Sequence, residues 1–257
     1  MTRIIMHGAC GRMGKVIAEV VSEDKDAEIV AGVDVYNDNK CEFPVFADIK
    51  DCDVEADVII DFSTASAVDG LLEYATEKNI PVVLCSTGLS AEQLDNVREA
   101  STKTAILKSA NMSLGINTII NLLKSATKVF VPAGFDVEIV EQHHHNKLDA
   151  PSGTAIALAD AINEAADNQL EYVYNRSDRR QARDKKELGI SAVRAGSIPG
   201  THDVIFAGQD EVIEIRHIAY SRRIFGVGAV SAAKFLAGKK PGMYDMQDVI
   251  QSTGLPE

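Results

Sequence analysis

Apolar residues in the first part of the chain alternate between short strand-like runs and helical spacing. The strand-like runs lie at residues 3–7, 28–33, 58–62, 81–85 and 104–108. Between several of them, apolar residues recur every three or four positions, as at Val68, Leu71 and Ala75, which predicts amphipathic helices. Repeated alternation of strand and helix with short connections predicts a doubly wound parallel sheet.

The pattern changes after residue 115. A longer helix is predicted from Ile116 to Phe130, followed by a strand at 135–141 and a helix at 155–166. Strand-like segments then follow one another closely, and their short connections favour antiparallel pairing. These segments lie at 190–195, 204–207 and 212–218. The middle of the chain is therefore predicted to form an α+β domain with an open mixed sheet.

Three further segments complete the pattern. Residues 172–187 are highly charged and show no clear period, so they are predicted to form a solvated loop or an exposed excursion. Residues 229–236 return to helical spacing, and Gly238 is expected to end that helix. A last helical segment is expected near residues 246–250.

Composition narrows the class of protein. The 257 residues are enough for two domains, and the net charge of −12 argues against a nucleic-acid partner, because phosphates require clustered Lys and Arg. The four cysteines have no CxxC spacing, so reduced thiols in a cytoplasmic protein are the simplest interpretation. No signal-peptide pattern or membrane-length apolar run occurs, so no membrane partner is expected.

A glycine-rich segment lies where the first predicted strand gives way to a helix. Its residues are Gly8, Ala9, Cys10, Gly11, Arg12, Met13 and Gly14. In a dinucleotide-binding turn, glycines allow a tight turn, close approach of a pyrophosphate and close packing of helix on strand, and the helix N-terminus offers N–H groups to phosphate. The GxxGxxG spacing is a variant of the usual GxGxxG, and a simple tight turn is the alternative. A doubly wound parallel sheet with a dinucleotide-binding turn after its first strand is a Rossmann-like fold, and this fold is predicted here.

Asp34 strengthens the cofactor interpretation. It follows the second predicted strand, about twenty residues after the glycine-rich segment, where an acidic residue binds ribose hydroxyls. A carboxylate repels a 2′-phosphate, and Val35, Tyr36 and Asn37 offer no positive charge to receive one. NADH is therefore favoured over NADPH, although Arg12 could reach a phosphate and leaves use of both cofactors open.

One run contains half of the six histidines, at 143–145, and is followed by Lys147. Histidine is the most common side-chain proton donor near neutral pH, and lysine can bind a carboxylate or donate a proton. A helix predicted to begin after Pro151 would present the N–H groups of Gly153 and Thr154 to an anion. This combination suits an acidic substrate that must be protonated.

Two other interpretations of the histidine run are weaker. His143 and His145 could bind a metal from one face of a strand, but no third ligand lies nearby, so no metal is predicted. The run could also be a merely polar loop. The lysine and the helix start that follow it disfavour that interpretation, although His145 alone could be passive.

The segment from Glu141 to Ala155 resembles the signature E-x-H-H-x-x-K-x-D-A-P-S-G-T-A of dihydrodipicolinate reductases, and every fixed position is present. Further blocks that resemble this family lie at 8–14, 61–63, 86–88, 109–115, 193–196, 214–217 and 221–222. The resemblance spans nearly the whole chain. It implies reduction of 4-hydroxy-tetrahydrodipicolinate to tetrahydrodipicolinate by NAD(P)H, with loss of water, in lysine and diaminopimelate biosynthesis.

The resemblance also implies roles for individual residues. His143 corresponds to the general acid, and Lys147 to a second proton donor or a substrate-carboxylate anchor. His144, Gly153 and Thr154 would hold substrate carboxylates. Asp34 and residues from three turns would line the cofactor, namely Gly8, Ala9, Cys10, Gly11, Arg12, Met13, Cys85, Ser86, Thr87, Ser109, Ala110, Asn111 and Met112.

Domain organisation is implied in the same way. Residues 1–114 and 223–257 would form a dinucleotide-binding domain, and residues 115–222 a substrate-binding and oligomerisation domain whose sheet builds a homotetramer. Two positions depart from the family pattern, because Cys85 stands where glycine is frequent and Met112 where an aromatic residue is common. Met112 is still expected to provide an apolar wall for the nicotinamide.

Two other functions would fit part of the sequence. An oxidoreductase similar to aspartate or homoserine dehydrogenase would share the pattern of the first domain, but the HH-x-x-K and P-S-G-T segments argue against it. A non-catalytic dinucleotide sensor would be expected to lack His143 or Lys147, and both are present.

Overall fold

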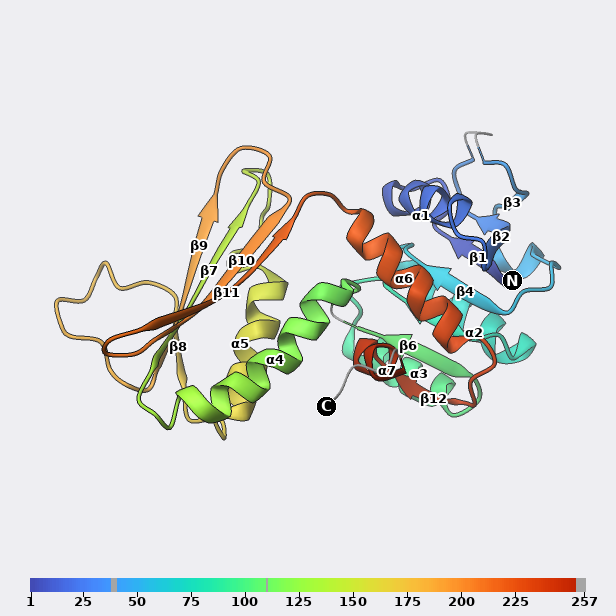
Figure 1. Cartoon of the computed structure of the whole chain (residues 1–257). Coiled ribbons are helices and arrows are strands. Elements are labelled where there is room, and N and C mark those ends of the chain that lie inside the picture. Colours follow the sequence, from blue (N-terminus) through green and yellow to red (C-terminus); the bar gives the residue numbers. More distant parts are fainter. Residues whose placement is uncertain (38–40, 110, 253–257) are drawn as a thin grey trace. The chain divides into compact units, whose positions relative to one another are not determined.

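The computed structural model describes residues 1–37, 41–109 and 111–252. The chain divides into two compact units (Figure 1), the first consisting of Met1–Leu114 with the chain from Arg222 onward, and the second of Gly115–Ser221. The glycine-rich segment lies in the first unit and the histidine run in the second. In the described part of the chain, none of the helices combines the length and apolar character needed to cross a membrane.

Within the described residues, the first unit contains a seven-stranded sheet in the order β12-β6-β5-β4-β1-β2-β3, with all its pairings parallel. The strands are β1 (Thr2–His7), β2 (Ala27–Val33), β3 (Val45–Phe46), β4 (Val58–Asp61), β5 (Val82–Leu84), β6 (Ala105–Lys108) and β12 (Gly242–Tyr244). The central strand β4 is buried at every position, as its continuous apolar run predicts. The predicted doubly wound parallel sheet is confirmed, and the two-residue β3 and three-residue β12 are edge strands that the sequence pattern did not reveal.

Helices cover both faces of this sheet. One face packs against α1 (Arg12–Ser22), α6 (Arg223–Leu236) and α7 (Met246–Ser252). The other packs against α2 (Val68–Lys78), α3 (Ala91–Ser101) and the short 3-10 helix η1 (Ile49–Asp51), and a second 3-10 helix, η2 (Ala65–Ala67), leads into α2. Helix α3 begins with a capping box, in which the Ser90 hydroxyl accepts from the Gln93 N–H and the Gln93 side chain accepts from the Ser90 N–H.

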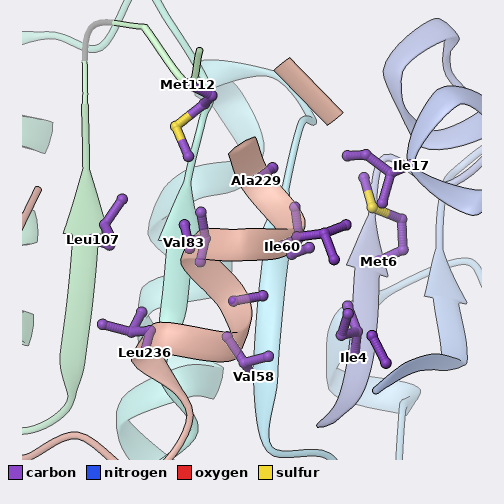
Figure 2. Close-up of a cluster of buried hydrophobic side chains, with 14 of the residues drawn as sticks. Ile4, Met6, Ile17, Val58, Ile60, Val83, Leu107, Met112, Ala229 and Leu236 are labelled. Atoms are coloured by element: carbon purple, nitrogen blue, oxygen red, sulfur yellow. The ribbon is translucent and has the colours of Figure 1, made fainter. Parts of the chain in front are cut away.

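The core beneath α6 packs along the central strands of the sheet. Figure 2 shows Ala229 and Leu236 of α6 facing strand residues such as Ile60, and all three are fully buried. A Cβ atom at Gly228 would lie 1.7 Å from the carbonyl oxygen of Met112, so the close approach of α6 to the segment after β6 requires glycine. This contact fixes a segment that was predicted to line the cofactor. Helix α6 begins earlier than predicted, at Arg223.

The second unit contains, in the part that is described, a five-stranded mixed sheet in the order β11-β10-β7-β9-β8. The strands are β7 (Asp136–His143), β8 (Glu171–Val173), β9 (Glu187–Arg194), β10 (Gly200–Ala207) and β11 (Val212–Ala219). Helices α4 (Leu114–Phe130) and α5 (Gly153–Ala165) share a core with this sheet. Strand β7 alternates strictly, and its buried positions are Val137, Ile139, Glu141 and His143. The predicted α+β unit with an open mixed sheet is confirmed.

Two expectations for the second unit were wrong. Strands β9 and β10 follow one another in the chain but do not pair, because β7 lies between them, parallel to β9 and antiparallel to β10. Only β10 and β11 form the expected antiparallel pair of consecutive strands. The charged segment is not entirely a loop, since residues 171–173 form the edge strand β8. Arg183 ties the rest of that segment to the sheet through the carboxylates of Asp136 and Glu138.

Candidate active site

The glycine-rich turn joins β1 to α1 at the centre of the parallel sheet. Gly8 has a left-handed backbone (φ +82°), and a Cβ there would lie 2.7 Å from the carbonyl oxygen of Phe62. A Cβ at Gly14 would lie 2.3 Å from the carbonyl oxygen of Ala9, so this glycine allows the helix to pack closely on the turn. Both glycines are therefore required by the geometry of the turn.

The start of α1 is available to an anion. Within the described residues, no side chain caps this helix at Gly11. The two oxygens of Asp34 accept the N–H groups of Cys10, at 2.9 Å, and Tyr36, at 3.0 Å. An ionised carboxylate has about four acceptor positions, so Asp34 can hold the turn and still accept from ribose hydroxyls. The turn, the helix start and the carboxylate fit a dinucleotide.

Two other predicted cofactor turns follow neighbouring parallel strands, at the same edge of the sheet as the glycine-rich turn. After β5, the Cys85 N–H donates to the carbonyl oxygen of Asp61 at 2.9 Å, and burial raises the pKa of the Cys85 thiol, which therefore stays protonated. Ser86 is buried and Thr87 exposed.

After β6, the Ser109 hydroxyl donates to the carbonyl oxygen of Asn111 at 3.0 Å, and the Asn111 side chain accepts the Ser113 N–H at 2.8 Å. Met112 is 4% exposed and belongs to the core beneath α6. Ala110 lies outside the described residues. The segment is thus held by local hydrogen bonds and by burial, while the apolar wall that Met112 was expected to offer the nicotinamide stays a prediction.

A buried acid–base pair that sequence reasoning missed lies at the same edge. Nδ1 of His7, at the end of β1, is 2.8 Å from Oδ1 of Asp61, at the end of β4. Asp61 is fully buried, and the Ser63 hydroxyl donates to it at 2.6 Å. Burial alone would raise the pKa of Asp61, but His7 and Ser63 outweigh it and lower that pKa. Parallel strands bring His7 and Asp61 together, and no short sequence motif contains both.

In the second unit, the candidate acid His143 lies on the helix-facing side of β7 beside Glu141. Glu141 is fully buried, and its Oε2 is 2.6 Å from His143 Nδ1. Arg194, at the end of the neighbouring strand β9, donates from both terminal nitrogens to the two Glu141 oxygens, at 2.8 and 2.7 Å. A bidentate arginine–carboxylate pair is strong and directional. Arg194 therefore fixes the position of the Glu141 carboxylate that contacts His143.

The same carboxylate reaches the start of α5. The Ser152 N–H donates to Glu141 Oε1 at 2.9 Å, and the Ser152 hydroxyl caps α5 by accepting the Ala155 N–H at 3.1 Å. The first helical residue, Gly153, is exposed, and a Cβ there would have no atom within 4 Å. Thr154 follows in the same turn. The predicted helix start thus lies beside the candidate acid, and the carboxylate of Asp149, which pairs with Lys147, accepts the Gly153 N–H.

The remaining residues of the histidine run form a turn after β7. The Lys147 N–H donates to the carbonyl oxygen of His144 at 3.1 Å, and Lys147 Nζ is 2.8 Å from an oxygen of Asp149. The Lys147 side chain is 22% exposed, so its charge is close to the surface of this turn. His145 is exposed and the His144 ring is half-buried. His143, His144, Lys147 and the start of α5 are thus parts of one local structure.

Burial and neighbouring charges shift the pKa values of Glu141, His143 and His202. Burial would raise the pKa of Glu141, but hydrogen bonds from Arg194 and His143 outweigh it, so the pKa is lowered and the carboxylate is ionised. Burial lowers the pKa of His143, and Glu141 opposes that shift. His202 of β10 packs against His143 with ring centroids 5.2 Å apart, and burial lowers its pKa to about 4.

The predicted site residues therefore form two clusters, one in each unit. Glu141 and Arg194 lie in segments that resemble the family, but the sequence assigned no role to either of them or to His202. The alternation E-x-H on a strand was an available signal, since residues two apart share a face. Among the described residues, no group of three or more His, Cys, Asp or Glu side chains is arranged to hold a metal ion.

The fold and the two clusters define a two-domain, dinucleotide-dependent oxidoreductase. Family models described as "Dihydrodipicolinate reductase, N-terminus" and "Dihydrodipicolinate reductase, C-terminus" match residues 2–112 and 115–250. The chain belongs to the dihydrodipicolinate reductase family. It is accordingly an NAD(P)H-dependent reductase of lysine and diaminopimelate biosynthesis.

Individual relatives agree over the full length. The 4-hydroxy-tetrahydrodipicolinate reductase of Caldanaerobacter subterraneus subsp. tengcongensis is 53% identical over 251 residues, covering 98% of this chain and 99% of that protein. Its counterpart from Clostridium tetani is 48% identical over 252 residues, with 98% of each covered. A solved structure of dipicolinate-bound dihydrodipicolinate reductase from Paenisporosarcina sp. TG-14 has a TM-score of 0.81 at 24% identity, covering 97% of this chain and 99% of that one, and supports the fold.

Proposed function

We propose that this protein reduces 4-hydroxy-tetrahydrodipicolinate to tetrahydrodipicolinate. Loss of water from the substrate leaves a conjugated cyclic imine, which takes up a hydride and a proton. The bound nicotinamide supplies the hydride. The observation that carries the proposal is the local structure of the second unit, in which a histidine beside a carboxylate held by Arg194 lies next to the N-terminus of α5. A proton donor next to an anion site suits a dicarboxylate that must be protonated.

Specific residues would perform the steps. His143 would donate the proton that accompanies the hydride. His144 and the N–H groups of Gly153 and Thr154 would bind substrate carboxylates, and Lys147 would anchor a carboxylate or act as a second proton donor. The ion pair between Lys147 and Asp149 would then exchange for one with the substrate, since Asp149 is exposed and Lys147 is partly exposed.

The first unit would bind the cofactor. The turn from Gly8 to Met13 would receive the pyrophosphate, and Asp34 the ribose, with the turns after β5 and β6 completing the site. NADH is the favoured cofactor, since the Asp34 carboxylate would repel a 2′-phosphate. The ratio of kcat/KM for NADH to that for NADPH measures this preference. A ratio well below one would contradict it.

The second unit would also build a homotetramer through its sheet. The face of β11 that turns away from the helices exposes Val212 and Ile218, at 58% and 43%, and apolar side chains on an open sheet face favour association. Sedimentation equilibrium is expected to give four times the mass of one chain, and a monomer would contradict the proposal. Cys10, Cys52 and Cys85 are reduced thiols, which supports a reducing, cytoplasmic location.

The reaction itself is tested by its product. The enzyme is incubated with NADH and freshly generated 4-hydroxy-tetrahydrodipicolinate, and the molecular mass of the product is measured by mass spectrometry. The expected species has lost the elements of water and gained two hydrogens, in equal amount to the NADH consumed. Dehydrated substrate without the added hydrogens, or no change at all, would contradict a reductase.

A further inference from the structure

We propose that Glu141 is a positioning residue, which fixes His143 with a proton on Nδ1 so that Nε2 is the atom that exchanges its proton with the substrate. This inference rests on the proposed function, in which His143 is the general acid. It adds a role for a residue that touches neither substrate nor cofactor in that scheme. Arg194 and Ser152 take part by holding the Glu141 carboxylate.

The hydrogen bonds around Glu141 determine which atom carries the proton. Its Oε1 accepts from Ser152 and Arg194, and its Oε2 accepts from Arg194, so three donor groups already point at the carboxylate. A fully buried carboxylate with these partners is ionised and can only accept. The 2.6 Å contact with His143 Nδ1 must therefore be a donation from Nδ1–H. In neutral His143, Nε2 is then the unprotonated nitrogen.

The surroundings of the other ring nitrogen agree with this assignment. A Cβ atom at Gly200, at the start of β10, would lie 3.0 Å from Nε2 of His143. Any other residue there would place its side chain against this nitrogen. Glycine at this position therefore leaves room beside Nε2 for a reacting group.

Glu141 also ties the acid to the candidate anion site. One carboxylate binds the end of β7 through His143, the end of β9 through Arg194 and the start of α5 through Ser152. Arg194 in turn donates to the carbonyl oxygen of Asp149 at 2.6 Å, just before α5. The proton donor and the helix N-terminus that would bind a substrate carboxylate are thus held at a fixed distance by one charged group.

Several charged or titratable groups face His143. Glu141 lies on its own strand, Arg194 comes from β9, His202 from β10 and Lys147 from the turn after β7. Among these, only Glu141 favours the protonated imidazole, while burial, Lys147 and Arg194 disfavour it. Removal of the Glu141 charge is therefore expected to make His143 harder to protonate.

The first test reads the tautomer in the unaltered enzyme. Histidine labelled with 15N on both ring nitrogens is incorporated, and the His143 signals are identified by their loss in the His143→Gln variant. Neutral His143 is expected to show a protonated Nδ1 and an unprotonated Nε2. A protonated Nε2 and a bare Nδ1 would overturn the inference, and this readout does not depend on turnover.

The second test uses Glu141→Gln, which keeps the size of the side chain and removes its charge. The expected result is a fall in kcat of about 100-fold with little change in KM for the cofactor. The basic limb of the kcat profile should also move to lower pH, because less His143 is protonated. Glu171→Gln, an exposed glutamate on the edge strand β8, is the matched control and should keep wild-type kinetics.

The two tests separate this inference from the proposed function. Absence of turnover in the unaltered enzyme would overturn the reductase reaction, whatever the tautomer. Normal turnover of the unaltered enzyme together with wild-type kcat and pH profile in Glu141→Gln would overturn the positioning role alone. Should the variant not fold, the tautomer of the unaltered enzyme still decides.

Discussion

At the scale of single residues, the candidate site contains two cations, Arg194 and Lys147, whose surroundings differ. Arg194 is locked on the buried Glu141 by two hydrogen bonds, whereas Lys147 pairs with Asp149 near the surface. A locked arginine can hold structure but is not free to meet a ligand. A lysine in a partly exposed pair changes partners more readily than a buried arginine held by two hydrogen bonds. This difference explains why Lys147 and not Arg194 is expected to bind substrate.

Replacement of the lysine tests that expectation. Lys147→Ala should raise KM for the dicarboxylate substrate at least about tenfold and also lower kcat, because an anchoring charge and a second proton donor are both removed. Steady-state kinetics with NADH measures both constants. Lys124→Ala, which breaks an exposed pair with Glu164 in the same unit, is the control and should change neither.

The residue scale also shows what the sequence could predict about the site. His143, Lys147, Gly153 and Thr154 were expected to act together because they lie within one short run. The bond between Arg194 and Glu141 joins residues 53 positions apart, and only the pairing of β7 with β9 brings them together. The spacing of residues in the sequence carries no information about that strand pairing. The contact between Arg194 and Glu141, which holds the carboxylate beside His143, could therefore not be predicted.

At the scale of elements, the glycine-rich turn depends on backbone contacts that admit no side chain. Gly14, in the first turn of α1, would place a Cβ inside the carbonyl groups of Gly8 and Ala9. Backbone atoms of a tight turn cannot move aside as a flexible side chain could. The turn and the start of α1 are therefore expected to shift together when this glycine is replaced.

A pair of glycine-to-alanine changes tests this packing. Gly14→Ala should weaken NADH binding at least about tenfold, because it distorts the phosphate-binding turn. Gly70→Ala in α2, where a Cβ would meet no atom within 4 Å, should leave binding unchanged and stabilise the fold by about 0.5–1 kcal/mol. Calorimetric titration with NADH and urea unfolding measure the two effects, and equal NADH affinity in both variants would contradict the assignment.

The sequence predicted most strands and helices correctly, but it did not predict the order of the strands in the second sheet. In the first unit, strands β1, β2, β4, β5 and β6 followed from apolar runs, because parallel strands buried on both faces have a strong signature. The short edge strands β3 and β12 did not. In the second unit, β9 and β10 looked like neighbours, yet β7 lies between them. Strand order is set by packing of distant segments, which local patterns do not record. The edge strand β8 was missed because charged residues surround it.

At the scale of the whole molecule, buried histidines couple stability to pH. Burial lowers the pKa of His202 to about 4, and lowers the pKa values of His143 and His217 as well. In the unfolded chain these residues have ordinary pKa values near 6.5. The unfolded state therefore takes up protons first as pH falls, so stability is complete above about pH 6.5 and decreases toward about pH 4.

Urea unfolding at two pH values tests this coupling. The free energy of unfolding is expected to be lower at about pH 5 than at about pH 7, with His202 alone contributing about 2 kcal/mol of the decrease. His202→Gln should show a smaller decrease, since one titrating group is removed. The exposed His145→Gln should keep the full decrease, and the same decrease in both variants would contradict the account.

The most direct test of the account is the initial rate of NADH oxidation with freshly generated 4-hydroxy-tetrahydrodipicolinate, measured for the unaltered enzyme, His143→Gln and His145→Gln. We expect turnover by the unaltered enzyme and by His145→Gln, and a kcat at least about 100-fold lower in His143→Gln with unchanged NADH affinity. Folded protein that binds NADH but gives no turnover would contradict the reductase reaction. Full activity of His143→Gln would contradict the assignment of the acid.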